Sequence, residues 1–196
     1  MKLAILIMAA GSSSRMGSIK QLLKIDGKTL LEKGIQTSKK ITNGPILCVL
    51  GAHAETIKKE VTFNNIHLVI NKEYASGLSS SIQSGIEYLQ KKQLSFDGIL
   101  ILLADQPAIQ PSYYQEMKTL FSANPQNIIA SAYETKMGVP AIFPKKYLSE
   151  IMQIRGDKGA QEFIQLNKLE VLSPKIPVNL FDLDTPEDYD SYLKTC

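Results

Sequence analysis

The sequence of 196 residues has few cysteines and no long apolar run, and both absences narrow the class of protein. Its two cysteines, Cys48 and Cys196, show neither metal-ligand spacing nor a disulfide framework, which predicts a reducing, cytoplasmic location. No segment approaches the apolar length that a bilayer requires. The net charge of +3 is spread over many lysines without a basic block, so neither a membrane nor nucleic acid is an expected partner.

Histidine is equally scarce, and this argues against hydrolytic chemistry. The only two, His53 and His67, lie far in sequence from any plausible nucleophile. The serine run 79–81 lacks the pattern of a nucleophile elbow and has no credible base. We therefore interpret both histidines as structural, with His53 in the first turn of a helix. We expect the serine run to open a helix after Gly77, either capped by Ser76 or Ser79 or facing a bound nucleoside.

The beginning of the chain has two interpretations. Lys2, the apolar stretch 3–10 and the small residues after it resemble a secretory signal peptide. However, this stretch is near the lower length limit for such a signal, and its bounds suit a buried strand that ends at a glycine turn. We favour the strand and keep the signal peptide as its alternative.

Apolar runs alternate with helical patterns along the first half of the chain. The expected strands are 3–9, 45–51, 66–71 and 98–104, and the expected helices are 30–40, 54–61 and 78–91. Strands that are continuous in Leu, Ile and Val are buried on both faces, as in a parallel sheet covered by helices. A helix over 113–121, strands at 128–133 and 138–143, and two further helices are expected after Pro111. The predicted fold class is α/β: a Rossmann-like, doubly wound, mainly parallel sheet with helices on both faces, in a single domain over residues 1–196.

Three of the predicted strands end in polar or glycine-rich segments. These segments are 9–17, 71–81 and the sequence "ADQP" at 104–107. The carboxyl ends of strands in open parallel sheets form the ligand crevice. We therefore expect the three segments to surround one binding site.

The segment after the first strand has the composition of a phosphate-binding loop. It does not match the dinucleotide fingerprint, because Gly11 has no glycine two or five positions later, and it also misses the P-loop pattern. Glycines can turn amide groups toward an anion, serines add donors and cations suit a polyphosphate; here these are Gly11, Gly17, Ser12, Ser13, Ser14, Arg15 and Lys20. A solvated turn that caps a helix is the alternative.

The scarcity of arginine favours phosphate binding. Arg15 and Arg155 are the only arginines in a chain rich in lysine, and each lies close to a glycine. Arginine can bind phosphate through two parallel hydrogen bonds, which a surface lysine cannot do.

Five segments together resemble a known enzyme family over almost the whole chain. They are "AAGSSSRMGSIKQLL" at 9–23, "LLADQPAI" at 102–109, "GVPAIF" at 138–143, "RGDKGA" at 155–160 and "FDLDTPEDY" at 181–189. These segments resemble the MobA-like nucleotidyltransferases, and in particular molybdenum cofactor cytidylyltransferases. Relatives that use GTP tend to carry a double glycine where this chain has Ala10 and Gly11, so the resemblance implies CTP. Two departures, Tyr74 for a common tryptophan and Gln161 for a frequent arginine, bear on the second substrate.

The resemblance implies three groups of site residues. Its nucleotide-binding residues would be Ala9, Ala10, Gly11, Ser12, Ser13, Ser14, Arg15, Gly17, Lys20, Gly77 and Ser81. The residues that act in catalysis would be Arg15, Lys20 and Asp105. The second-substrate region would contain Gly138, Pro140, Arg155, Gly156 and Asp157.

Two carboxylates are candidate ligands for Mg²⁺. Asp105 directly follows a buried strand and offers a hard oxygen ligand on a rigid element, although it can also be a simple turn former. Near the C-terminus, Thr185 can cap a helix in a capping box with Asp188, which leaves Asp184 free to be the second ligand that the resemblance implies. Asp182 would lie further from the crevice and is the weaker candidate.

These observations predict a Mg²⁺-dependent enzyme that transfers CMP from CTP to the phosphate of molybdopterin or its molybdenum-loaded form, with release of pyrophosphate. The attacking phosphate is largely dianionic at neutral pH, so the protein needs no general base. The same chemistry with GTP, or with a sugar or alditol phosphate, is one alternative. Another is a non-catalytic nucleotide-binding adaptor for molybdoenzyme maturation. A molybdoenzyme or its maturation chaperone is the expected protein partner.

Overall fold

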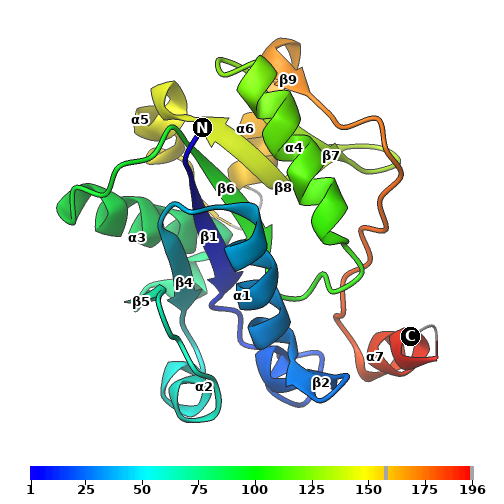
Figure 1. The fold of residues 1–196 in the computed structure, drawn as a ribbon. Coiled ribbons are helices and arrows are strands. Elements are labelled where there is room, and N and C mark those ends of the chain that lie inside the picture. The colour runs from blue at the N-terminus through cyan, green and yellow to red at the C-terminus, as the bar shows by residue number, and fades with distance from the viewer. Residues whose placement is uncertain (157–158, 195–196) are drawn as a thin grey trace.

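The protein is described by a computed structural model over residues 1–156 and 159–194, and its centre is a seven-stranded sheet. The strand order is β5-β4-β1-β6-β8-β7-β9. The bounds are β1 Leu3–Ala9, β4 Ile46–Leu50, β5 His67–Ile70, β6 Gly98–Leu103, β7 Ile128–Ala132, β8 Met137–Pro144 and β9 Val171–Leu172. β8 pairs antiparallel with both β6 and β7, and every other pairing in this sheet is parallel. The expected mainly parallel sheet is confirmed (Figure 1).

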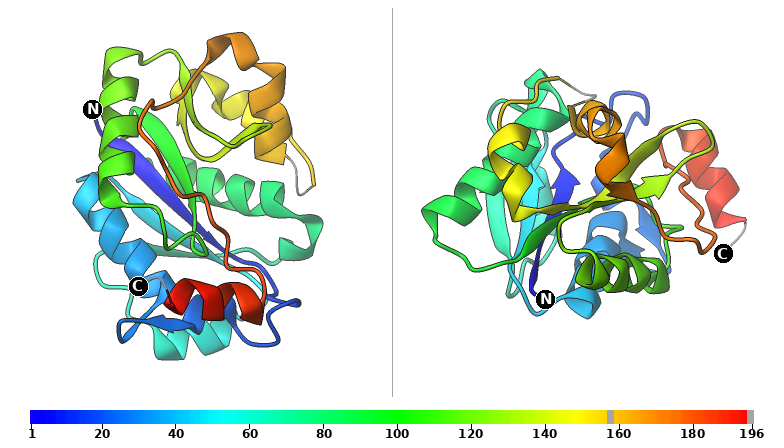
Figure 2. Two further views of the ribbon diagram at one scale, coloured as in Figure 1. Left: turned by 90° about the vertical axis from the view of Figure 1, so that its right-hand side faces the viewer. Right: turned by 90° about the horizontal axis from the view of Figure 1, so that it is seen from above.

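Helices cover both faces of the sheet (Figure 2). The longer ones are α1 Leu30–Ile41, α3 Leu78–Lys91 and α4 Pro111–Ala123, and the shorter ones are α2 Ala54–Glu60, α5 Leu148–Ile151, α6 Gly159–Leu166 and α7 Pro186–Leu193. Buried side chains of α1, α2 and α4 pack on one face, and those of α3, α5 and α6 pack on the other. The doubly wound arrangement predicted from the sequence is therefore present.

Strand β1 shows why its sequence is apolar throughout. Ile5 and Ile7 point into one core cluster, whereas Leu6 and Met8 point into the other, because side chains alternate between the faces of a strand. All seven residues of the strand are buried. A strand in the middle of a two-faced sheet has no solvent side, so it contains no polar residue.

The C-terminal segment crosses the molecule and returns to the end of β1. After β9 the chain runs in extended form to α7, which lies near the small hairpin of β2 Lys24–Ile25 and β3 Lys28–Thr29 (Figures 1 and 2). Leu183 is fully buried in a small cluster with Ile25 and Leu30, and the Tyr189 hydroxyl donates to the Lys24 carbonyl at 2.6 Å. Residues from the N-terminal and C-terminal parts of the sequence are thus held together near the carboxyl end of β1.

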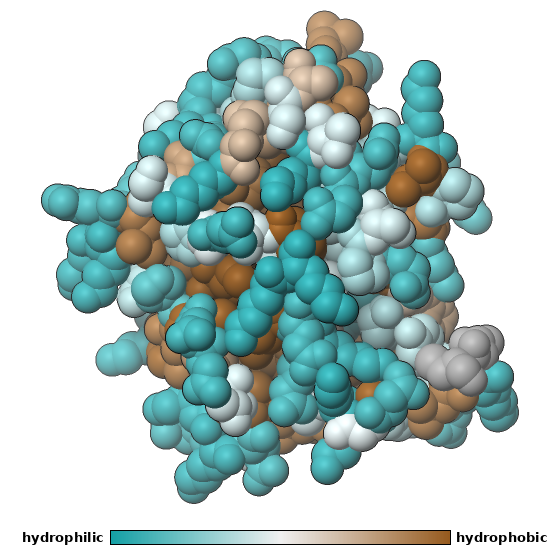
Figure 3. Space-filling view, viewed as in Figure 1, coloured by the Kyte–Doolittle hydropathy of each residue, from teal (hydrophilic) through white to brown (hydrophobic). Residues whose placement is uncertain are grey.

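The surface is mainly polar on the face shown in Figure 3, where hydrophobic residues are seen mostly between hydrophilic ones. Among the described residues, no helix combines the length and the apolar character that crossing a membrane would require.

Candidate active site

A cleft of about 220 Å³ lies at the carboxyl ends of β1 and β6. Its lining comes from all three segments that the sequence predicts to meet, and includes Ala10 and Gly11 after β1, Tyr74, Gly77 and Ser81 after β5, and Asp105 after β6. A smaller hollow, lined by Lys20 and Gln21, adjoins it and shares Gly11 and Asp105. The predicted crevice at the carboxyl ends of the strands is therefore present.

The loop between β1 and the short 3-10 helix η1 (Lys20–Leu22) is shaped by two left-handed residues, Ser13 with φ 55° and Gly17 with φ 68°. The side-chain amide of the buried Gln21 donates to the carbonyl of Ala9 at 3.0 Å and to that of Gly11 at 3.3 Å. Its oxygen accepts from the Ser13 hydroxyl at 3.3 Å. Gln21 therefore connects the beginning of the loop to its end.

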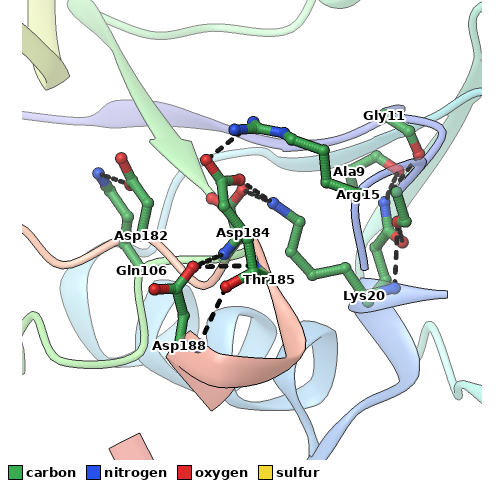
Figure 4. A network of polar contacts seen from close by, with 12 residues as sticks. Ala9, Gly11, Arg15, Lys20, Gln106, Asp182, Asp184, Thr185 and Asp188 are labelled. Carbon is green, nitrogen blue, oxygen red and sulfur yellow. Dashed lines mark hydrogen bonds and ion pairs between the residues drawn. The ribbon is translucent and has the colours of Figure 1, made fainter. Parts of the chain in front are cut away.

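Lys20 lies between two carboxylates. Its ammonium donates to Asp105 Oδ2 at 2.7 Å and to Asp184 Oδ1 at 2.8 Å (Figure 4). Arg15 Nη2 donates to the other oxygen of Asp184, Oδ2, at 2.8 Å. The structure thus brings together the two predicted metal ligands and the two predicted phosphate-binding cations.

The charges in this cluster stabilise one another. Burial lowers the pKa of the Lys20 ammonium, but the charges and hydrogen bonds of Asp105 and Asp184 outweigh burial and raise its pKa above the ordinary value. Burial raises the pKa of Asp184, but Lys20 and Arg15 outweigh that effect and hold its pKa below the ordinary value. At neutral pH Lys20 and Asp184 are therefore both ionised.

Backbone contacts explain how two residues so distant in sequence meet. The Leu183 N–H donates to the Asp105 carbonyl at 3.0 Å, which ties the C-terminal segment to the end of β6. The next turn is fixed by a capping box, in which the Thr185 hydroxyl accepts from the Asp188 N–H and the Asp188 carboxylate accepts from the Thr185 N–H. The predicted capping of α7 is confirmed, and the Asp184 carboxylate takes no part in it.

The two carboxylates fit a divalent cation. They already converge on one cationic group, and Asp105 Oδ1 is buried without a hydrogen-bond partner among the described residues. In the described part of the chain, no group of three or more His, Cys, Asp and Glu side chains forms a metal site. Two protein carboxylates leave further coordination positions for phosphate oxygens and water, as is usual for Mg²⁺ at nucleotide sites.

Asp182 belongs to a different set of contacts. Its Oδ1 accepts from Gln106 Nε2 at 2.8 Å, and the same nitrogen donates to the Tyr133 hydroxyl at 3.1 Å, so Asp182 is paired away from Lys20 (Figure 4). Partial burial raises the pKa of Asp182, and the nearby charges of Asp105 and Asp184 raise it further, against the hydrogen bond from Gln106. Asp182, Tyr133 and Gly138 line a neighbouring pocket of about 170 Å³.

The predicted second-substrate residues are only partly together. Gly138 lines the neighbouring pocket, whereas Pro140 is buried in β8, where its carbonyl accepts from Ser131. Arg155 is exposed and donates to carbonyls of its own loop, those of Met152 and Ile154. The Gly156 carbonyl accepts from the Ser79 N–H at 3.2 Å. Asp157 lies outside the described residues.

The expected helix after Gly77 is confirmed, but the alternative in which Ser76 or Ser79 caps it is wrong. Gly77 is the N-cap residue, with φ 94°, and no side chain caps the helix. The hydroxyls of Ser80 and Ser81 instead accept from the Asn71 side chain at 2.8 and 2.9 Å. A left-handed backbone favours glycine over serine at that position.

Sequence reasoning did not single out Gln21 or Gln106, and it took His53 to be only structural. His53 is the N-cap residue of α2, and its Nε2 lies 2.9 Å from the Ser12 carbonyl. Gln106 directly follows Asp105, and Gln21 directly follows Lys20. Adjacency to a charged candidate was the only available signal, because each amide acts on groups that are distant in sequence.

Known proteins with similar sequences and structures indicate the family. The model of the MobA-like NTP transferase domain matches residues 5–172. The purine catabolism protein PucB of Bacillus subtilis is 28% identical over 198 residues, covering 93% of this chain and 92% of PucB. The molybdenum cofactor cytidylyltransferase of Escherichia coli is 22% identical over 187 residues, covering 94% of this chain and 92% of that protein.

Solved structures agree with the fold. Rv0371c from Mycobacterium tuberculosis, solved in complex with manganese, superposes with a TM-score of 0.79 at 20% sequence identity, and the match covers 100% of each chain. The family model covers most of the sequence, from β1 to β9, and includes the loop after β1 and Asp105. The chain therefore belongs to the MobA-like NTP transferase domain family.

Proposed function

We propose that this nucleotidyltransferase-family protein transfers CMP from CTP to the phosphate of molybdopterin, or of its molybdenum-loaded form, and releases pyrophosphate. The observation that carries the proposal is the Lys20 ammonium between Asp105 and Asp184, at the edge of the cleft. Such a cluster combines carboxylates for a hard cation with cations for a polyphosphate. The E. coli cytidylyltransferase matches nearly the whole chain and supports the choice of substrates.

Each member of the cluster has a proposed role. Arg15 and Lys20 would bind the triphosphate and stabilise the charge that develops on the departing pyrophosphate. Asp105 and Asp184 would hold Mg²⁺, which when bound would supply charge neutralisation at the α-phosphate. The acceptor phosphate needs no base, so this chain's work is to align the two substrates and to balance their charge.

The two pockets suggest how the substrates are arranged. The cleft beside Ala10, Gly11 and Gly77 would hold the nucleoside, and the pocket beside Gly138 and Asp182 would hold the acceptor. Both pockets share Leu78 and Leu103 in their lining, so they adjoin. The acceptor phosphate would then approach the α-phosphate from the side of β8.

The choice of CTP over GTP rests on the resemblance at Ala10 and Gly11, and the packing next to the cleft supports it. Gly51 packs against the cleft-lining residues Ala10 and Tyr74: a Cβ atom added to it would lie 2.6 Å from the Ala10 carbonyl oxygen and 2.6 Å from the Tyr74 Cβ, so this wall has little freedom to move. A pocket fitted to a pyrimidine accepts a purine only if backbone moves. We therefore expect higher turnover with CTP when the two nucleotides compete.

Variants of the carboxylates separate catalysis from binding alone. Asp105→Asn and Asp184→Asn should each lower cytidylyl transfer by orders of magnitude while the thermal unfolding midpoint changes little. Normal transfer in both variants would contradict the metal role.

A wild-type protein that binds CTP but transfers nothing to any acceptor would instead be an adaptor for molybdoenzyme maturation. Transfer only with GTP, or only to a sugar or alditol phosphate, would change the substrates and keep the reaction. In the proposed reaction, a molybdoenzyme or its maturation chaperone would receive the cytidylylated product.

A further inference from the structure

At the beginning of the loop after β1, the carbonyls are bonded within the protein and the N–H groups are not. Five consecutive carbonyls, from Ala9 to Ser13, each accept a hydrogen bond from the protein. In the described part of the chain, the N–H groups of Gly11, Ser12, Ser13 and Ser14 donate none. The first turn of the loop therefore presents four N–H groups without protein partners to a ligand, which is the electrostatic character of an anion receptor.

Two side chains bind three of these carbonyls. The Gln21 amide donates to the carbonyls of Ala9 and Gly11, and the imidazole of His53 contacts the carbonyl of Ser12. The Ala10 carbonyl accepts from the Ala52 N–H at 3.2 Å. Because carbonyl and N–H in a trans peptide point in opposite directions, fixing each carbonyl also fixes the N–H that follows it.

Gln21 also fixes the position of Lys20. The Lys20 N–H donates to the Ser13 hydroxyl at 3.1 Å, and that hydroxyl donates to Gln21 Oε1. Gln21 is only 5% exposed, so it acts through the loop more than by contact with a ligand. The same amide thus sets the loop that carries Arg15 and the backbone from which the Lys20 ammonium reaches the carboxylates.

We propose that Gln21 and His53 are positioning residues that keep the N–H groups at the beginning of the loop oriented to receive the triphosphate before it binds. This inference rests on the proposed function, because it assigns the loop to the triphosphate of the nucleotide. A loop already shaped for its ligand binds without the cost of ordering on association. Neither residue exchanges a proton or contacts the reacting phosphorus.

The chain contains a matched control for Gln21. The Gln83 amide also donates to two carbonyls two residues apart, those of Met152 at 3.1 Å and Ile154 at 2.8 Å, in a different loop. Gln21→Met and Gln83→Met therefore remove the same kind of contact and keep side-chain length. Only the first should change affinity for a polyphosphate.

The test measures binding of inorganic tripolyphosphate and of CTP by calorimetry, with thermal unfolding in parallel. Gln21→Met should weaken both ligands by about tenfold or more, and Gln83→Met should leave both unchanged at a similar loss of stability. Equal affinities in wild type and Gln21→Met would overturn the inference. If wild type binds CTP but the variant binds it equally well, only the inference fails; if wild type binds neither ligand, the proposed function fails with it.

His53→Phe keeps the proposal testable if Gln21→Met does not fold. The substitution retains an aromatic ring at the N-cap position and removes both ring nitrogens, including the Nε2 that contacts the Ser12 carbonyl. Steady-state kinetics should show a higher KM for CTP with an unchanged KM for the acceptor. A merely structural role would instead reduce the active fraction and leave both KM values as they are, and that result would contradict the positioning role.

Discussion

Replacing Lys20 by methionine should change the affinities for metal and for triphosphate in opposite directions. The ammonium lies between Asp105 and Asp184, the residues that would hold the metal, 2.7 and 2.8 Å from their oxygens, and the Lys20 side chain is 14% exposed. A metal ion that binds without nucleotide must displace it. Each hydrogen bond to a charged partner contributes about 1.5–3 kcal/mol, so relief from one such contact should tighten metal binding by about ten- to a hundredfold.

The triphosphate loses a cationic partner in the same variant. Its affinity in the absence of metal should fall by a similar factor, about ten- to a hundredfold, because one charge-assisted contact is removed. Mn²⁺ binding followed by electron paramagnetic resonance, and CTP binding in EDTA followed by calorimetry, measure the two effects. Lys33→Met, which breaks a 2.6 Å pair with Asp26 away from the cleft, is the control. Unchanged or weaker Mn²⁺ binding by Lys20→Met would refute the reasoning.

Three further substitutions test the surroundings of the cluster by thermal or denaturant unfolding. Thr185→Ala removes the cap of α7 and should lower the free energy of unfolding by about 0.5–2 kcal/mol; no loss would contradict the capping box. Asp182→Asn keeps an acceptor for Gln106 but removes a carboxylate whose pKa is raised by partial burial and nearby charges. Its unfolding midpoint should exceed that of wild type at pH 7, with the difference vanishing below about pH 3, where both states bind the proton; a lower midpoint at pH 7 would contradict this assignment. Gly51→Ala should destabilise the protein and weaken CTP binding, because its Cβ would lie 2.6 Å from the Ala10 carbonyl oxygen; wild-type stability would show that this approach can relax.

The fold was predictable because its sequence pattern is strong. Strand β1 must be apolar at every position to lie between two helical layers, and this is visible without coordinates. The capping box at Thr185 was equally predictable, since it depends on residues three positions apart. Local patterns therefore sufficed for the long strands and helices and for their order, but not for the short hairpin β2–β3, for β9, or for the three helices that follow β8 where two were expected.

The contacts between distant segments were not predictable in the same way. Gln21 and His53 act on carbonyls, which every residue possesses, so their own sequence context does not reveal their partners. The contact of Lys20 with Asp184 depends on the hydrogen bond from the Leu183 N–H to the Asp105 carbonyl. This bond joins the C-terminal segment to the end of β6, which is distant from it in sequence. The sequence left a serine cap of α3 open as an alternative because composition alone does not show that Gly77, with a left-handed backbone, is the N-cap residue.

The most direct test of the account is the identity of the product formed with Mg²⁺ and a panel of nucleoside triphosphates and phosphorylated acceptors. Mass spectrometry should detect an adduct of CMP with molybdopterin or its molybdenum-loaded form, with one pyrophosphate released for each adduct. Asp105→Asn should abolish the adduct while CTP remains bound. A guanylyl adduct formed in preference to the cytidylyl one, or CTP binding without any adduct, would contradict the proposed reaction.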